Sequence, residues 1–387
     1  MTDKSKEIFS GFTDGFFNMT RILPLVISMC VCSTFSMNAS LFSAVICSLA
    51  YPFTGLLPSF SLFVVLYSVS AFYGLNTALA GVLLCAVLLV VLSFLKTEKL
   101  KSAVYTPVTA AVMLGFTLYM TVMQTTDYFG IGAVGKNVVE MLKSYRSLGF
   151  HGNWRGVLYG TIVLVVMIVY RRKFKNLSKK IPAAFWCFVI TIPLNIILIP
   201  GNIISPINEI GTYDYYSGLI DFSNINIFGG IICGFSLLFV YLYRFTVDDV
   251  PANKKNILLS SAFVCACSIA GCVAPYPSKK QENSIITKII TAVSCSILCS
   301  LIIVFLNKPI GRTPVSTCAV ILIIGMWQQN IWSYLKSAFT SGITGIIAFI
   351  CVITIIMVIN PETGIVIAAF ISAGYKIINI KKKRITE

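Results

Sequence analysis

Two proline–serine pairs interrupt long apolar runs in this sequence. Pro277-Ser278 lies in APYPSKKQENSIITK, where Lys279 and Lys280 follow directly, and Pro58-Ser59 lies in GLLPSFSLF. A helix N-terminus offers unbonded N–H groups and the positive end of its dipole, and both attract anions. We therefore interpret the two pairs as the starts of two half-helices that face each other, with lysine adding positive charge between them.

The residues nearest these pairs are the candidate anion contacts. Ser59, Phe60 and Ser278 are predicted to contact the anion, and Lys279 is predicted to pair with its charge, with Lys280 as the alternative if the register shifts by one. The competing interpretations are that the serines only cap helices and that the lysines lie in a hairpin outside the membrane. A lysine at membrane depth usually faces a water-filled cavity.

Three further residues are candidates for a supporting role. Pro58 opens the first pair. Arg21 lies inside the first apolar run, where the favoured interpretation is a side chain that extends to the membrane surface. Gln124 is expected to hydrogen-bond a neighbouring helix.

The composition identifies the broad class. Of 387 residues, 57% are hydrophobic and 11% are charged, against about 25% charged in soluble domains, and the mean hydropathy is +0.87. Runs of about 18 apolar residues predict membrane-spanning helices, and the alternating polarity of a barrel is absent. The predicted fold is an all-α polytopic membrane protein with about fourteen helices. The 13 cysteines are interpreted as reduced and buried, and no metal or cofactor is expected.

The net charge of +16 is concentrated in short connections, which indicates topology control rather than nucleic-acid binding. The basic segments 96–101, 171–180 and 380–387 fall on one side, and the acidic segment 209–221 falls on the other. Both termini are therefore predicted to be cytoplasmic, in a plasma (inner) membrane. Residues 133–148 combine apolar and basic positions in the pattern of an amphipathic helix that lies at the membrane surface.

Short motifs recur in the same order in the two halves. Thr-Pro-Val-Thr at 106–109 matches Thr-Pro-Val-Ser at 313–316, and Pro58-Ser59 matches Pro277-Ser278. Seven helices in each half would place the second copy in inverted orientation, a recurring transporter architecture. The predicted domains are a cytoplasmic N-terminus, a first seven-helix repeat, an extracytoplasmic linker, a second seven-helix repeat and a basic cytoplasmic tail, at 1–14, 15–200, 201–226, 227–379 and 380–387.

Several segments together resemble the sulfate permease (SulP) family of anion transporters. The similar segments are GFFNMTRILPLVISM (15–29), PVTAAVMLGFTLYMTVMQTTDYFG (107–130), KKIPAA (179–184), Ser278-Lys279 and NPETG (360–364). The resemblance implies two inverted seven-helix repeats that form a core and a gate domain. It also implies a small anion as substrate, carried by an elevator-like movement of the core, and a chain that could form a homodimer.

The sequence departs from the family pattern at several positions. Leu25 replaces the usual glutamine after the first-helix proline, Leu57 replaces a glycine, and Lys279 replaces arginine. Lysine keeps the charge but loses the two-pronged geometry that suits planar oxyanions. The acid that many members carry in the eighth helix is absent from Gly229–Tyr243, and the family's C-terminal regulatory (STAS) domain is not expected after Glu387.

Three other functions are weaker alternatives. A nucleobase or benzoate permease of the same architecture would need carboxylates inside the second half, where only Glu282 is a candidate. An intramembrane enzyme would need paired acids, a histidine cluster or a nucleophile–base pair within the spans, and the sequence has a single histidine, His151. A non-transporting or channel-like membrane component is the third.

Overall fold

The computed structural model describes residues 3–33, 35, 37–54, 56–94, 105–131, 133–149, 152–198, 222–247, 254–269, 275–277, 284–328 and 331–386. Three predicted site residues, Ser278, Lys279 and Lys280, lie outside the described residues, as does most of the predicted linker.

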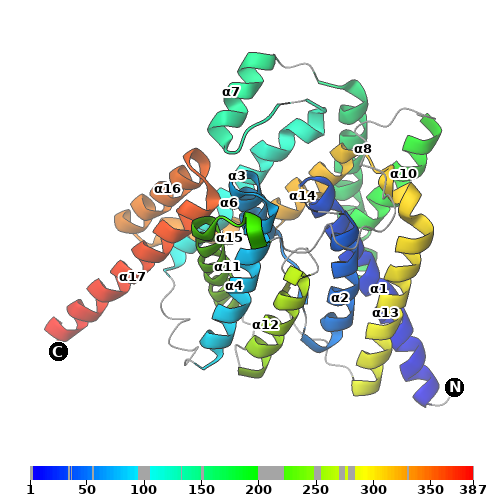
Figure 1. The fold of residues 1–387 in the computed structure, drawn as a ribbon, viewed down its shortest axis with the longest axis horizontal. Coiled ribbons are helices and arrows are strands. Elements are labelled where there is room, and N and C mark those ends of the chain that lie inside the picture. Colours follow the sequence, from blue (N-terminus) through cyan, green and yellow to red (C-terminus); the bar gives the residue numbers. More distant parts are fainter. Residues whose placement is uncertain are drawn as a thin grey trace.

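Helices form nearly all of the described chain (Figure 1). The first half contains α1 (Asp3–Val31), α2 (Met37–Thr54), α3 (Phe60–Tyr73), α4 (Leu75–Ser93), α6 (Thr106–Phe129), α7 (Val138–Leu148), α8 (Trp154–Lys173), α9 (Lys175–Lys180) and α10 (Ala183–Leu198). The second half contains η1 (Phe222–Asn224), α11 (Ile227–Val247), α12 (Lys254–Ile269), α13 (Ile285–Gly311), α14 (Val315–Trp327), α15 (Ile331–Thr340), α16 (Ile343–Val358) and α17 (Pro361–Thr386). Two strands of three residues, β1 (Leu56–Pro58) and β2 (Pro275–Pro277), complete the fold.

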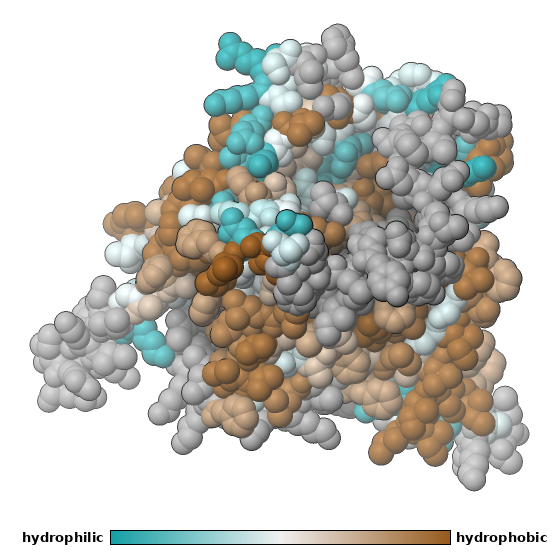
Figure 2. Space-filling view, in the orientation of Figure 1, coloured by the Kyte–Doolittle hydropathy of each residue, from teal (hydrophilic) through white to brown (hydrophobic). Residues whose placement is uncertain are grey.

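Five of the described helices, α1, α4, α6, α8 and α13, are long and apolar enough to cross a membrane, and shorter apolar helices surround them. Large apolar side chains are exposed along the outer helices, as Phe305 and Phe370 are, each 73% exposed. Figure 2 shows brown, apolar surface over much of the lower and left parts of the view and teal, polar surface near α7 at the top. Apolar side chains facing outward are what a lipid environment requires. The predicted class, an all-α polytopic membrane protein, is confirmed.

The helices pack in pairs that repeat between the two halves. The contact between α1 and α13 corresponds to that between α11 and α4, and the contact between α2 and α13 corresponds to that between α12 and α4. In the same way, α16 packs on α6 as α8 packs on α14. In each comparison, a helix of one half takes the place of its counterpart in the other half. Two structural repeats with the same fold would produce this pattern.

Close approach at two equivalent crossings depends on glycine. A Cβ at Gly15 of α1 would lie 2.0 Å from Ser294 Oγ of α13, and a Cβ at Gly81 of α4 would lie 2.4 Å from Cys233 Cβ of α11. Small residues allow membrane helices to gain dispersion energy by close backbone contact. The two crossings are counterparts under the exchange of halves.

One predicted element differs from the structure. The pattern of polar and apolar residues predicts a short segment at Glu282–Lys288, separate from the apolar span Ile289–Leu306, but its described part, from Ile285, is the first turn of the long helix α13. Ser284 caps this helix by accepting a hydrogen bond from the Thr287 N–H at 3.2 Å. Ile285 is 73% exposed, so the start of α13 lies at the surface.

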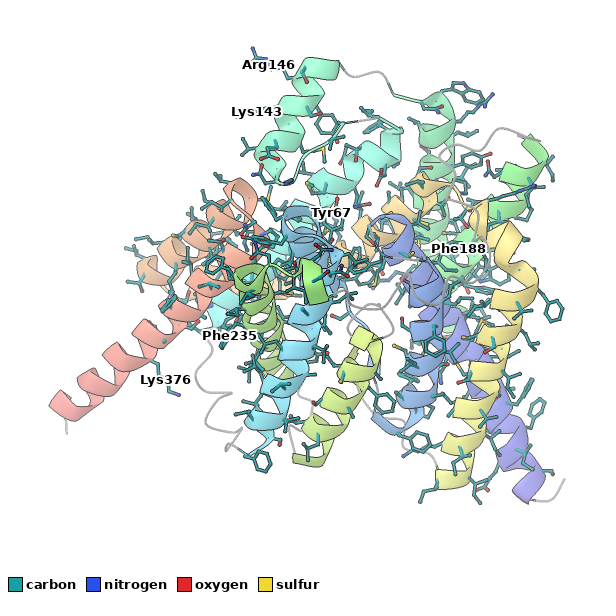
Figure 3. All side chains as sticks on the ribbon, viewed as in Figure 1. Tyr67, Lys143, Arg146, Phe188, Phe235 and Lys376 are labelled. Atoms are coloured by element: carbon teal, nitrogen blue, oxygen red, sulfur yellow. The ribbon has the colours of Figure 1, made fainter. Side chains whose placement is uncertain are left out.

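The amphipathic helix after α6 is present as α7, which begins at Val138 rather than at Ala133. Asn137 accepts a hydrogen bond from the Glu140 N–H at 2.8 Å, and Glu140 accepts one from the Lys136 N–H at 2.9 Å. These reciprocal bonds fix the helix start. Figure 3 shows Lys143 and Arg146 pointing away from the body of the protein, as expected of the polar face.

Candidate functional site

The two proline–serine segments lie side by side in the structure. β1 and β2 pair in antiparallel fashion, with Leu56 opposite Pro277 and Pro58 opposite Pro275. The two strands are more than two hundred residues apart in sequence, and α3 begins directly after β1. The prolines of the two pairs identified from the sequence, Pro58 and Pro277, therefore lie in neighbouring strands that run in opposite directions.

Ser59 stands at the start of α3 without capping it. Its backbone is extended, and its side chain makes no capping hydrogen bond. It is 4% exposed, and Ser59 Oγ has no hydrogen-bond partner among the described residues. The first intrahelical bond runs from the Phe63 N–H to the Ser59 carbonyl, and the N–H groups of a first helical turn have no intrahelical acceptor. A buried hydroxyl without a partner costs about 1–3 kcal/mol, so a polar ligand would relieve this site.

A cavity of about 690 Å³ adjoins the start of α3. Phe60, the first residue of α3, lines it together with Leu25 of α1. The opposite wall comes from α8, α9, α10 and α14, and includes Met167, Ile321 and Gln328. The Phe60 ring rests on Gly325 of this wall, where a Cβ would lie 2.3 Å from Phe60 Cζ.

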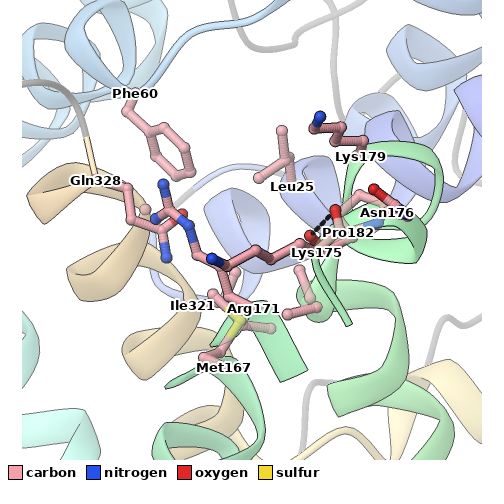
Figure 4. Close-up of a pocket in the computed structure, with 14 residues that line it drawn as sticks. Leu25, Phe60, Met167, Arg171, Lys175, Asn176, Lys179, Pro182, Ile321 and Gln328 are labelled. Atoms are coloured by element: carbon pink, nitrogen blue, oxygen red, sulfur yellow. Dashed lines mark hydrogen bonds between the residues drawn. The ribbon is translucent and has the colours of Figure 1, made fainter. Parts of the chain in front are cut away.

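Three cationic side chains line this cavity, Arg171, Lys175 and Lys179, and none of its lining residues is acidic. Figure 4 shows Arg171 and Lys175 extending toward Gln328 and the Phe60 ring, with Lys179 near Leu25. The first turn of α10 also lines the cavity, through Pro182 to Ala184, and adds the positive end of a helix dipole. The cavity is therefore suited to an anion.

The predicted supporting residues have mainly structural contacts. Arg21 donates a hydrogen bond from Nη2 to the Lys179 carbonyl, so it links α1 to α9. Gln124 is fully buried and its Nε2 lies 3.5 Å from the Cys32 carbonyl at the end of α1, which is the neighbouring-helix contact expected. Pro58 is the last residue of β1.

Sequence reasoning missed two features of the site. The basic segment 171–180 was interpreted only as a determinant of topology, yet three of its side chains line the cavity. Glu362, within the NPETG motif, was not considered as a buried acid. It is 0% exposed and accepts a hydrogen bond from Ser68 Oγ at 2.7 Å. The motif's helix-start pattern could have indicated an acid in the first turn of α17, but not its burial.

These features define a helical membrane fold with two related halves, and solved structures with this fold are known. The transmembrane domain of a cyanobacterial bicarbonate transporter, BicA, superposes with a TM-score of 0.71 at 14% identity, over 94% of this chain and 97% of that one. SLC26A9 gives a TM-score of 0.72 at 11% identity, over 96% of this chain and 66% of that one. The murine Slc26a9 anion transporter in the inward-facing state gives 0.72 at 11% identity, over 98% and 69%.

No protein-family profile matches the sequence, and no curated protein sequence matches it. These structures are of a bicarbonate transporter and of a solute carrier 26 anion transporter, so the resemblance noted in the sequence is confirmed at the level of the fold. At 11–14% identity the likeness establishes the architecture, a multi-pass α-helical membrane protein.

Proposed function

We propose that this chain is a divergent member of the sulfate permease family and a secondary transporter of a small anion. The observation that carries the proposal is the start of α3. There, the buried Ser59 hydroxyl has no hydrogen-bond partner in the part of the chain that the structure describes, and the adjoining cavity has three cationic side chains and no acidic one among its lining residues. Sulfate, bicarbonate, chloride and small carboxylates are the substrate class.

Binding would combine three contributions. The Ser59 hydroxyl and the first N–H groups of α3 donate hydrogen bonds to the anion. Lys279 or Lys280, which follow β2 in sequence, supply the charge close to the anion. Arg171 and Lys175 raise the local concentration of anions, because a cavity lined by one sign of charge focuses the field.

Movement of the anion would come from a displacement of one helix group against the other. Leu25 and Phe60 belong to the group of α1–α4 and α11–α13, whereas Arg171, Lys175 and Ile321 belong to the group of α6–α10 and α14–α17. The cavity lies on the boundary between these groups. An elevator-like movement of the first group would carry the anion past the second. The basic segment 171–180 supports an opening on the cytoplasmic side of a plasma membrane, because basic connections are enriched on that side.

Ser59→Ala separates a binding role from a structural one. Because Ser59 Oγ has no hydrogen-bond partner among the described residues, its removal should not lower stability. A hydrogen bond to a charged group contributes about 1.5–3 kcal/mol, so the variant should weaken apparent anion affinity about 10- to 100-fold.

The test is uptake of labelled sulfate, bicarbonate, chloride or a dicarboxylate into proteoliposomes that contain the purified chain. Saturable uptake of at least one anion, reduced in Lys279→Ala, supports the proposal. Absence of anion-dependent flux across the panel would refute it. Uptake competed by uracil or benzoate would instead assign the nucleobase or benzoate class, and unchanged flux in Lys279→Ala would remove that lysine from the site.

A further inference from the structure

Glu362 is a carboxyl group buried at the contact between the two helix groups. It lies in the first turn of α17 and is fully buried, as is Ser68 of α3. Ser68 Oγ donates to Glu362 Oε2 at 2.7 Å, while Glu362 Oε1 has no hydrogen-bond partner among the described residues. The bond therefore joins the group expected to move to the group expected to stay.

The surroundings of Glu362 contain no described cation. Four helices pack against α17, namely α3, α6, α11 and α16. The titratable groups facing Glu362 are the Tyr119 phenol of α6 and the Cys233 thiol of α11, and the Cys351 thiol of α16 is exposed. No Lys or Arg among the described residues acts on the carboxyl. An isolated buried carboxylate is costly, which favours the neutral acid, whereas a helix N-terminus favours the charged form.

Glu362 and the cationic cavity lie at different points along α3. Phe60, the first residue of α3, lines the cavity, and Ser68, which donates to Glu362, is eight residues further along the helix. At the rise of an α-helix this is a displacement of about 12 Å. Tyr119, which faces Glu362, donates a hydrogen bond to the Lys136 carbonyl just before α7.

The open cavity at the start of α3 and the buried contact further along the same helix together suggest a role for the acid. We propose that Glu362 is a proton-binding group of the closed end of the anion path, and that its hydrogen bond with Ser68 holds that end shut. This inference deepens the proposed function by naming the proton as a second ligand of the transport cycle.

The proposed step is a simple proton transfer. When α3 moves away from α17, water reaches Glu362, the carboxyl O–H bond breaks, its electron pair stays on the carboxylate, and the proton passes to water. The charged carboxylate resists reburial, so the end stays open until Glu362 takes up a proton again. Closure, and with it completion of the cycle, then requires one proton.

The test compares variants in proteoliposomes, with anion uptake measured while the external pH is varied at fixed internal pH. We expect wild-type uptake to depend on external pH and Glu362→Gln to lose this dependence, because glutamine keeps the shape but cannot titrate. Ser68→Ala should keep the pH dependence with a shifted midpoint. The matched controls are Ser70→Ala, on the same helix with its hydroxyl bonded to the Tyr67 carbonyl, and Glu140→Gln on α7. An unaltered pH profile in Glu362→Gln would overturn the inference.

A second measurement does not depend on transport. Infrared difference spectroscopy of the purified chain should show a protonated-carboxyl band that titrates with pH and is lost in Glu362→Gln. If this band is present while no anion of the panel is taken up, the proton site stands and the proposed function falls. If no such band is assigned to Glu362, the inference falls whatever the flux.

Discussion

Gly325→Ala tests the geometry of the cavity wall directly. A Cβ at this position would lie 2.3, 2.8 and 3.0 Å from three atoms of the Phe60 ring. Ordinary contact between carbon atoms is about 3.5–4.0 Å, so the ring must move by roughly 1 Å or more. Overpacking of this kind costs about 1–3 kcal/mol. The displaced ring would also narrow the cavity beside Ser59, so anion uptake should fall together with stability.

Gly374→Ala is the matched control for this substitution. Gly374 also lies inside a helix, α17, but a Cβ there meets nothing within 4 Å. Both substitutions gain the helix propensity of alanine, about 1 kcal/mol relative to glycine. The difference between the two variants therefore isolates the clash, and should be about 1–3 kcal/mol.

The assay is the midpoint of unfolding in detergent, with uptake in proteoliposomes measured in parallel. Phe60→Ala should remove the clash, so a double-mutant cycle of Gly325→Ala with Phe60→Ala should show a coupling of about 0.5–3 kcal/mol. The reasoning is refuted if Gly325→Ala is as well tolerated as Gly374→Ala, or if Phe60→Ala gives no rescue.

Three further predictions follow from the described contacts. Arg171→Gln should raise the apparent KM for anions at low ionic strength, and by less at high salt because solvent-exposed charges are screened. Lys143→Gln, on the outer face of α7, should leave the apparent KM unchanged. Gly81→Ala should destabilise the protein by about 1–3 kcal/mol through its clash with Cys233, measured as a lower unfolding midpoint and relieved by Cys233→Gly. Asn137→Ala should cost about 0.5–2 kcal/mol by removing the cap of α7, measured as faster amide exchange confined to that helix; protection equal to wild type would exclude the cap.

Much of the architecture could be predicted from the sequence because the bilayer leaves few choices. Apolar runs bounded by proline and charge mark the helices. Such runs predict helix starts at Ser59, Pro107 and Pro314, and the observed α3, α6 and α14 each begin within one residue of these positions. The meeting of Pro58 with the Pro277 segment could be anticipated because both interrupt a helix in corresponding places of two halves.

The rest depends on packing that a linear sequence does not contain. The start of α13 is one example. Ile285 belongs to the first turn of α13, and that helix packs against α1, where Gly11 lies close to Ile290. The cationic wall was missed because Arg171 and Lys175 have the spacing of a topology-determining loop. Glu362 was missed because an acid in a helix first turn is usually solvated, and only the tertiary contact with Ser68 reveals its burial.

The central claim is that an anion binds at the start of α3 and is carried across the membrane. The most direct test is the initial rate of anion uptake as a function of anion concentration, for wild type and Ser59→Ala in proteoliposomes. We predict saturation in both, with the half-saturating concentration raised about 10- to 100-fold in Ser59→Ala and the unfolding midpoint not lowered. A rate that rises linearly without saturation, or identical curves for the two proteins, would contradict it.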